Sequence, residues 1–166
     1  MIEPQQPGRP MRESRAEYSE LAMPNDANPL GSLFGGKVMA LVDLAASISA
    51  HRHARCPVVT ASIDHMNFLY PVRIGELVTC YSQVNRVFRT SMEVGVRVMV
   101  ENLSTGEKRH TSTAYLTFVA FATAGERVLL APVIPETDDE RRRYEQAQLR
   151  REARLALRER ALERSK

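Results

Sequence analysis

The hydrophobic and polar positions along the chain predict one long helix followed by a run of strands. From Val38 to Ala50 apolar residues recur at helical spacing, the opposite side is also apolar, and Asp43 is the only charged residue. A helix that is apolar nearly all round is buried in a core. The basic residues of 51–55 then mark its end, where positive charge suits the helix dipole.

After this helix, four segments have the composition and length of β-strands. The third of them alternates cleanly, with Met92, Val94, Val96, Val98 and Val100 on one face. Short turns between the segments predict an antiparallel meander or hairpins. A shorter strand is expected over 16–23. The pattern predicts an α+β fold in which a sheet wraps around the helix, with strands over 58–68, 76–87, 91–101 and 109–122.

The two ends of the chain differ from this body in composition. Residues 1–14 are rich in Pro, Gln, Gly and Arg and predict a disordered tail, which leaves 15–133 as the domain. Residues 134–166 begin with acids and continue with arginines, which predicts a solvent-exposed helix with Thr137 as its N-cap. An arginine-rich RNA-binding arm is the alternative for 134–166, but the interleaved glutamates weaken the positive electrostatic field of this segment.

Composition narrows the class of protein further. A chain of 166 residues with 43% hydrophobic and 26% charged residues is typical of one soluble globular domain. A net charge of +3 does not indicate nucleic acid, and Cys56 and Cys80 lack the spacing of a metal site. The first residues contain no apolar signal region, and no run of about 18 apolar residues suggests a membrane span. We therefore expect a cytoplasmic protein.

The stretch GSLFGGKV, residues 31–38, resembles the start of a nucleotide-binding phosphate loop. That loop needs Ser or Thr after its lysine to hold magnesium, and Val38 stands there instead. No buried strand precedes the stretch either, which argues against nucleotide hydrolysis. Gly35 and Gly36 could instead leave backbone N–H groups open to a substrate oxygen, as in an oxyanion hole. The local pattern alone favours a simpler role, close entry of the helix against the sheet.

Asp43 is a candidate for chemistry because of its place about two turns into the apolar helix. An unpaired buried carboxylate costs several kcal/mol or shifts its pKa. No basic residue lies one turn away to pair with it. The carboxylate must therefore reach a polar cavity or receive partners from another chain. Buried acids of this kind are frequent at functional sites, although structural hydrogen-bonded ones exist.

Four stretches together resemble a known family. They cover about 25–121 and read NPLGSLFGGKVMALVDLAA, VVTASIDHMNFLYPVRIGELV, RVFRTSMEVGVRVMVEN and TSTAYLTFVAF. They are similar to the hotdog-fold acyl-CoA thioesterases of the bacterial and cytosolic acyl-CoA hydrolase type. The resemblance implies a long helix wrapped by an antiparallel sheet, dimers formed by sheet extension and often trimers of dimers. It also implies an acyl-CoA substrate with no metal or cofactor.

The resemblance assigns roles to four residues at the reacting centre. Asp43 matches the helix carboxylate that activates water or attacks the thioester. Asn28 matches the loop asparagine that faces the aspartate of the partner subunit. Gly36 lies at the backbone N–H that polarises the carbonyl, and Thr60 matches a strand residue lining the same site.

A second matching segment is assigned to the CoA portion of the substrate. Arg89, Thr90 and Ser91 correspond to the family's RTS segment. Two residues depart from the common pattern. Phe88 stands where the family often has glycine, and Phe34 occupies a place where many hotdog enzymes have histidine.

The sequence supports two other functions of the same fold less well than it supports thioester hydrolysis. A hotdog dehydratase needs a site histidine paired with an acid, and His65 follows Asp64 on a predicted strand, where neighbours point to opposite faces. A non-catalytic acyl-CoA-binding regulator is the remaining alternative, since the fold can bind without hydrolysing. The presence of both Asn28 and Asp43 argues against the regulator and for thioester hydrolysis.

Overall fold

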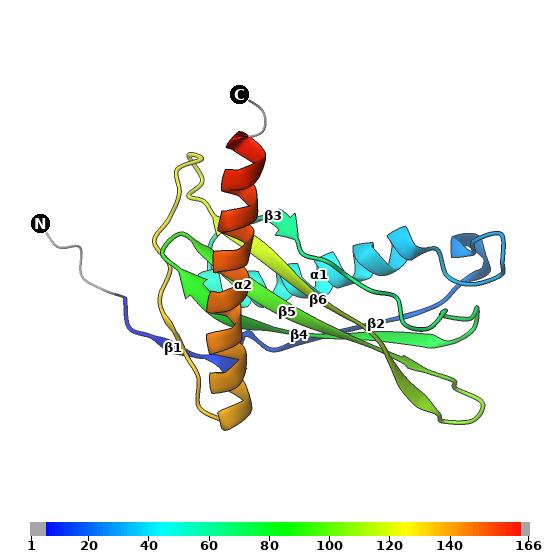
Figure 1. The fold of residues 1–166 in the computed structure, drawn as a ribbon. Helices are drawn as coiled ribbons and strands as arrows, with labels where there is room; N and C mark the ends of the chain where they lie inside the picture. Colours follow the sequence, from blue (N-terminus) through cyan, green and yellow to red (C-terminus); the bar gives the residue numbers. More distant parts are fainter. Residues whose placement is uncertain (1–5, 164–166) are drawn as a thin grey trace, which may run out of the picture.

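The computed structural model describes residues 6–163, except for the side chain of residue 162. Its five-stranded antiparallel sheet has the order β2-β4-β5-β6-β3 and curls around one side of the long helix α1 (Figure 1). The second long helix, α2, lies on the opposite face of the sheet (Figure 1). The elements are β1 Arg9–Pro10, η1 Met11–Ser14, β2 Ala16–Leu21, η2 Pro24–Asp26, α1 Gly35–Ala54, β3 Val58–Ile63, β4 Leu77–Phe88, β5 Ser91–Glu101, β6 Lys108–Ala120, β7 Val133–Ile134 and α2 Asp138–Glu163.

The meander predicted for the strands is present in β4, β5 and β6, which pair in sequence order. The first strand behaves differently from the prediction. β3 ends at Ile63 rather than Phe68, and it pairs with β6 instead of β4. The segment 64–76 is therefore a long connection that carries the chain from β3, at one edge of the sheet, to β4 beside the other edge.

The core lies between α1 and the concave face of the sheet. Val94, Val96 and Val98 of β5 are at most 1% exposed, as their alternation predicts, and they belong to one cluster with Val42 and Ala45 of α1. Burying such an aliphatic side chain is worth about 1.5–3 kcal/mol, so this layer holds the helix in the sheet.

The helix α1 is not buried all round, as its sequence had suggested. Met39 is 40% exposed and Leu44 is 48% exposed, because the sheet of a single chain covers only one side of the helix. The neighbouring edge strand β3 also exposes Val59 (57%) and Ile63 (37%). An open strand edge beside exposed apolar side chains is a surface suited to association.

The N-terminal segment contradicts part of the predicted disordered tail. Residues 1–5 lie outside the described part, but β1 pairs with β7 in a small parallel ladder. Met11 is fully buried in the core. Ser14 donates from Oγ to the carbonyl of Met11 (2.7 Å) and accepts from the N–H of Val84 (3.0 Å). The prediction of disorder is therefore wrong for residues 9–14, because one buried methionine and one hydroxyl fix a polar stretch.

The predicted N-cap of the charged helix is confirmed. The Thr137 hydroxyl accepts the N–H of Glu140 (3.2 Å), and the Glu140 carboxylate accepts the N–H groups of Glu136 (2.8 Å) and Thr137 (3.3 Å). This reciprocal arrangement is a capping box. Glu140 is itself only 1% exposed and also receives a hydrogen bond from Gln83 of β4 (2.9 Å). The cap therefore also attaches α2 to the sheet.

A second buried acid attaches the middle of α2 to the sheet. Glu93 of β5 is fully buried and pairs with Arg150 (2.7 Å) and Arg154 (3.2 Å) of α2. The prediction of a solvent-exposed helix is thus wrong for this face. Leu155 and Leu157 do remain exposed. Neither long helix in the described residues carries an apolar run able to cross a membrane.

His53 is a buried histidine at the end of α1. Its side chain is 2% exposed, and Nε2 lies 2.8 Å from the carbonyl oxygen of Ala131, so Nε2 donates. Nδ1 has no partner in the described structure. Burial lowers the pKa of His53 from its usual 6.5, which outweighs the opposing effect of the bond to Ala131.

We expect the free energy of unfolding to fall as the pH drops below about 6.5, because the unfolded state then binds a proton that buried His53 does not. The loss should continue until the pH passes the lowered pKa of the folded state. His53→Gln should keep a donor to Ala131 and lose this part of the pH dependence. Urea unfolding of both proteins at pH 8 and pH 5.5 measures the difference. Equal losses of stability in the two proteins would exclude His53 as the cause.

Candidate active site

The first turn of α1 presents two free backbone donors. The N–H groups of Lys37 and Val38 both donate to the carbonyl oxygen of Phe34, at 2.9 and 3.3 Å. The N–H groups of Gly35 and Gly36 come earlier and have no acceptor within the helix. A Cβ on Gly36 would come within 2.5 Å of the Phe34 ring, so glycine fits the close packing of this turn. The positive end of the helix dipole and the open N–H groups can both stabilise a developing oxyanion.

Lys37 does not behave as the lysine of a phosphate loop. Its ammonium pairs with Glu20 (2.6 Å) and Asp26 (3.5 Å), and the hydrogen bond to Glu20 raises the pKa of Lys37. Its charge is therefore already matched by two carboxylates of its own chain. This arrangement agrees with the rejection of a nucleotide loop on sequence grounds.

Asn28 organises the loop that leads into α1. Its side-chain oxygen accepts the N–H groups of Leu30 (2.9 Å) and Ser32 (3.1 Å). Its backbone carbonyl accepts the N–H of Gly31 (2.9 Å), whose φ of +74° is accessible to glycine. The oxygen of the amide is thus committed to the loop, and the amide NH₂ is left as the donor that can serve a ligand.

Asp43 and Thr60 are brought together by α1 and β3. The Thr60 hydroxyl donates to Oδ1 of Asp43 at 2.7 Å. Both residues are half-buried in the single chain, so Asp43 is less enclosed than its sequence surroundings predicted. This is the only hydrogen bond of the Asp43 side chain within residues 6–163. A register shift between Thr60 and Ser62 interrupts the pairing of β3 with β6 immediately after Thr60.

The four residues predicted for the reacting centre form two separate groups within one chain. Gly36 lies in the first turn of α1 and Asn28 in the loop that leads into it, whereas Asp43 lies near the middle of α1 and is bound by Thr60 of β3. Gly36 and Asp43 are seven residues apart, which is about 10 Å along a helix. No hydrogen bond within the described chain joins Asn28 to Asp43. A single thioester group cannot contact both groups of one chain at once.

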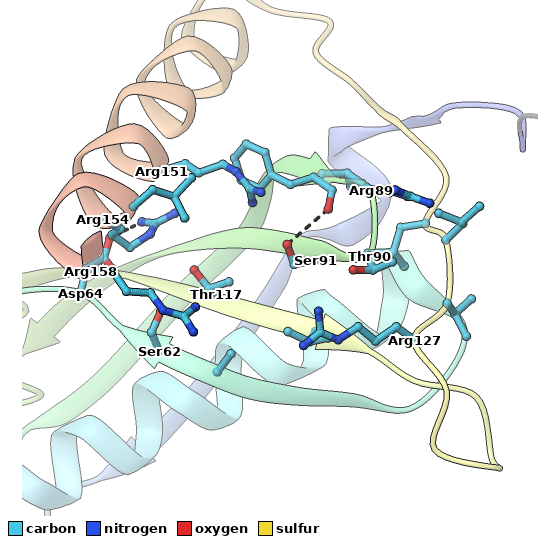
Figure 2. A pocket seen from close by; sticks show the side chains of 18 of the residues that line it. Ser62, Asp64, Arg89, Thr90, Ser91, Thr117, Arg127, Arg151, Arg154 and Arg158 are labelled. Carbon is cyan, nitrogen blue, oxygen red and sulfur yellow. Dashed lines mark hydrogen bonds and ion pairs between the residues drawn. The ribbon is translucent and has the colours of Figure 1, made fainter. Parts of the chain in front are cut away.

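The predicted CoA segment lines a large cavity at the other end of β3. Arg89 and Thr90 form the turn between β4 and β5, Ser91 begins β5, and Arg89 has a φ of +51°. They line a cavity of about 1910 Å³ together with Ala61 and Ser62, the two residues that follow Thr60 (Figure 2). The edge strand β3 therefore separates the two features: Thr60 faces Asp43 on the α1 side of the sheet, and Ser62 faces the cavity on the α2 side.

Residues that the sequence interpretation missed complete this wall. They are arginines from α2 and from the loop after β6, namely Arg127, Arg151, Arg154 and Arg158 (Figure 2). The available signal was the helical spacing of 151, 154 and 158, which places these positions on one side of α2. Asp64 faces Arg154 (2.5 Å) and is thus an ion-pair partner rather than the acid of a catalytic dyad with exposed His65. Within the described residues, no cluster of His, Cys, Asp and Glu is suited to a metal.

Comparison with known proteins decides the family. Residues 30–107 match the Thioesterase superfamily. An uncharacterized acyl-CoA thioester hydrolase of Bacillus subtilis is 43% identical over 129 residues, which is 78% of this chain and 75% of that protein. The chain belongs to the hotdog-fold acyl-CoA thioesterases. The predicted fold class, family and enzyme class are therefore confirmed.

Solved structures agree with this assignment over nearly the whole chain. A hexameric acyl-CoA thioesterase is 40% identical, with a TM-score of 0.88 over 91% of this chain and 97% of that one. An acyl-CoA hydrolase from Staphylococcus aureus, solved with butyryl coenzyme A, coenzyme A and coenzyme A disulfide, is 33% identical. Its TM-score is 0.85 over 95% of this chain and 98% of that one. Hydrolysis of acyl-CoA thioesters is accordingly the activity of this thioesterase.

Proposed function

We propose that Asp43 is the base or nucleophile of this thioesterase and that Thr60 holds it in place. The observation that carries the proposal is the 2.7 Å hydrogen bond from the Thr60 hydroxyl to the Asp43 carboxylate. This bond fixes one oxygen and leaves the other, Oδ2, for water or substrate. A positioned carboxylate and an open helix N-terminus are together the two elements that thioester hydrolysis needs.

The reaction needs no group beyond water and these residues. Asp43 takes a proton from water as the water oxygen bonds to the thioester carbon, or it first attacks that carbon itself. In the second case the loss of CoA leaves an anhydride on Asp43, and water then hydrolyses it to free the acid and the carboxylate. The Gly36 N–H stabilises the negative charge that develops on the carbonyl oxygen. The carbon–sulfur bond then breaks, and CoA leaves as a thiolate that is protonated to the free thiol. The products are a carboxylic acid and CoA.

We further propose that each site forms between two subunits. The roughly 10 Å along the helix between Gly36 and Asp43 of one chain is too long for one carbonyl group and its attacking water. Exposed Met39 and Leu44, together with the open edge of β3, offer the surface for a second copy. Association there would place Asn28 and Gly36 of one subunit against Asp43 of the other. A homodimer, assembled into a trimer of dimers as the hexameric relative suggests, fits this arrangement.

The choice of residues has support from the Staphylococcus aureus hydrolase. That enzyme has been solved with alanine in place of its own Asn28, Asp43 and Thr60, and the Asn28 variant holds coenzyme A. These variants match the present fold with TM-scores of 0.84–0.87. For the CoA portion we propose Arg89, Thr90 and Ser91, which line the cavity beyond Thr60.

Thr60→Val should lower kcat about tenfold, because a hydrogen bond to a charged group is lost without a change in side-chain shape. Thr60→Ser is the matched control that keeps the hydroxyl, and it should retain most of the activity. A thiol-release assay in the presence of chelator, run across short, medium and long acyl-CoAs, measures both variants. Equal activity of the Val and Ser variants would remove Thr60 from the site. A wild-type protein that binds the whole panel without turnover would be an acyl-CoA-binding regulator instead.

A further inference from the structure

We infer that α2 supplies part of the CoA site: Arg151 and Arg158, with Arg127 opposite them, bind the phosphate groups at the nucleotide end of CoA. This inference rests on the proposed function, since it concerns the same substrate. It gives the C-terminal helix a role in binding substrate. The role follows from the charge, the pairing and the placement of the arginines around the cavity.

The cavity beyond Thr60 is strongly cationic. Its wall contains five arginines, 89, 127, 151, 154 and 158, and a single acidic residue, Asp64. Asp64 is already paired with Arg154. In Figure 2, Arg127 and Arg158 extend into the hollow from opposite sides, with Thr117 between them. So much positive charge in one concave wall is costly unless an anion occupies it, and it would attract a polyanion.

The arginines of α2 are of two kinds. Arg150 and Arg154 pair with Glu93, and Arg154 also pairs with Asp64, so these two attach the helix to the sheet. Arg151 and Arg158 line the cavity and have no carboxylate partner among residues 6–163. The first pair therefore fixes the helix, and the fixed helix holds the second pair over the cavity. This preorganisation reduces the entropy that ligand binding must overcome.

Phe88 strengthens the case for Arg151. The Arg151 guanidinium lies over the Phe88 ring, 4.4 Å from its centroid. Phe88 itself lines the cavity, so its ring forms an aromatic platform for this arginine at the cavity wall. Stacking leaves the N–H groups at the guanidinium rim free to donate. Phe88 of β4 and Arg151 of α2 therefore form one unit of the cavity wall.

The chemistry of the wall selects phosphate as the ligand group. Guanidinium groups bind phosphate through paired hydrogen bonds, and the hydroxyls of Thr90, Ser91 and Thr117 add neutral donors on the same wall. The wall includes Ser62, which follows Thr60 on the edge strand β3 but pairs with Thr117 on the face of the sheet that carries α2. A substrate whose thioester meets Asp43 would reach this cavity with its other end by passing β3 at the register shift after Thr60. In CoA, that end carries a diphosphate and a 3′-phosphate.

The test compares CoA binding in Arg151→Gln/Arg158→Gln and in Arg160→Gln. Arg160 is exposed on the same helix but is not part of the cavity wall, so it controls for charge. Calorimetry should show the Kd for CoA rising about tenfold or more in the double variant and staying unchanged in the control. The kcat/KM for acyl-pantetheine, which lacks the nucleotide, should be the same in all three proteins. Adenosine 3′,5′-bisphosphate, the nucleotide end alone, should displace CoA from the wild type.

Three results would overturn the inference. They are an unchanged Kd for CoA in the double variant, an equal loss of kcat/KM for acyl-pantetheine, and binding of the bisphosphate without displacement of CoA. The last result would mean that the arginines serve a separate nucleotide site. The Kd for CoA does not depend on turnover, so this inference and the assignment of Asp43 fail independently. Asp43→Asn should bind CoA as the wild type does.

Discussion

Asp43→Asn is expected to lower kcat about 10²–10⁴-fold, the usual cost of losing a general base, while KM for acyl-CoA changes little. The amide has nearly the same shape as the carboxylate, and its oxygen can still accept the Thr60 hydroxyl now bound at 2.7 Å. Stability should be unchanged or raised, because a partly buried charge is removed. Thiol release gives kcat, and urea unfolding gives the stability.

Asp138→Asn is the matched control for this substitution. Asp138 lies at the first position of α2, and its side chain is fully exposed. The same chemical change there should leave kcat unaltered. An Asp43→Asn enzyme as active as the Asp138→Asn control would place the base elsewhere. His65 would not be a better base, because in the structure it is exposed and follows an aspartate already paired with Arg154.

The sheet could be predicted well because its strands follow one strong rule. β5 has the predicted bounds Ser91–Glu101, and its alternating valines are buried against α1. The connection after β3 was not predicted, because short turns and a long crossover have similar composition. No local sequence pattern predicts that β3 pairs with β6. Pairing between distant strands depends on tertiary contacts, which periodicity does not report.

The surroundings of the predicted site residues were harder to predict than their positions. Asp43 was identified as a charge in an apolar helix, but the sequence does not show that Thr60 donates to it. The helix also appeared buried all round, whereas Met39 and Leu44 are exposed in the single chain. An apolar face that meets a second subunit has the same composition as one that meets the core. Hydrophobicity alone therefore cannot separate folding from assembly.

The arginines of α2 show a second limit of the sequence pattern. Alternating acids and arginines are typical of a solvated helix, and that description hid two different roles. Arg150 and Arg154 pair with the buried Glu93, an acid placed between Met92 and Val94 on β5. Arg151 lies over Phe88, and Arg158 faces the cavity. The angle at which α2 crosses the sheet decides which arginines pair with Glu93 and which line the cavity. Tertiary contacts set that angle.

Chains carrying Asn28→Ala and chains carrying Asp43→Asn should each be nearly inactive alone and regain activity when co-folded. If Asn28 of one subunit acts with Asp43 of the other, every mixed dimer holds one doubly altered site and one intact site. Each heterodimer should then show about half of the wild-type rate, and a random equal mixture about a quarter, if the sites are independent. Thiol release, measured against the mixing ratio, gives this recovery.

Two controls make this complementation test specific to a shared site. Asn28→Asp keeps an oxygen to accept the N–H groups of Leu30 and Ser32, so it separates loss of the amide NH₂ from collapse of the loop. Asn28→Ala chains co-folded with the Asn28→Ala/Asp43→Asn double variant have no intact site in either arrangement and should stay inactive. If both residues belonged to one chain's site, every site in the first mixture would carry one substitution. No mixing ratio would then restore activity, and the shared site between subunits would be excluded.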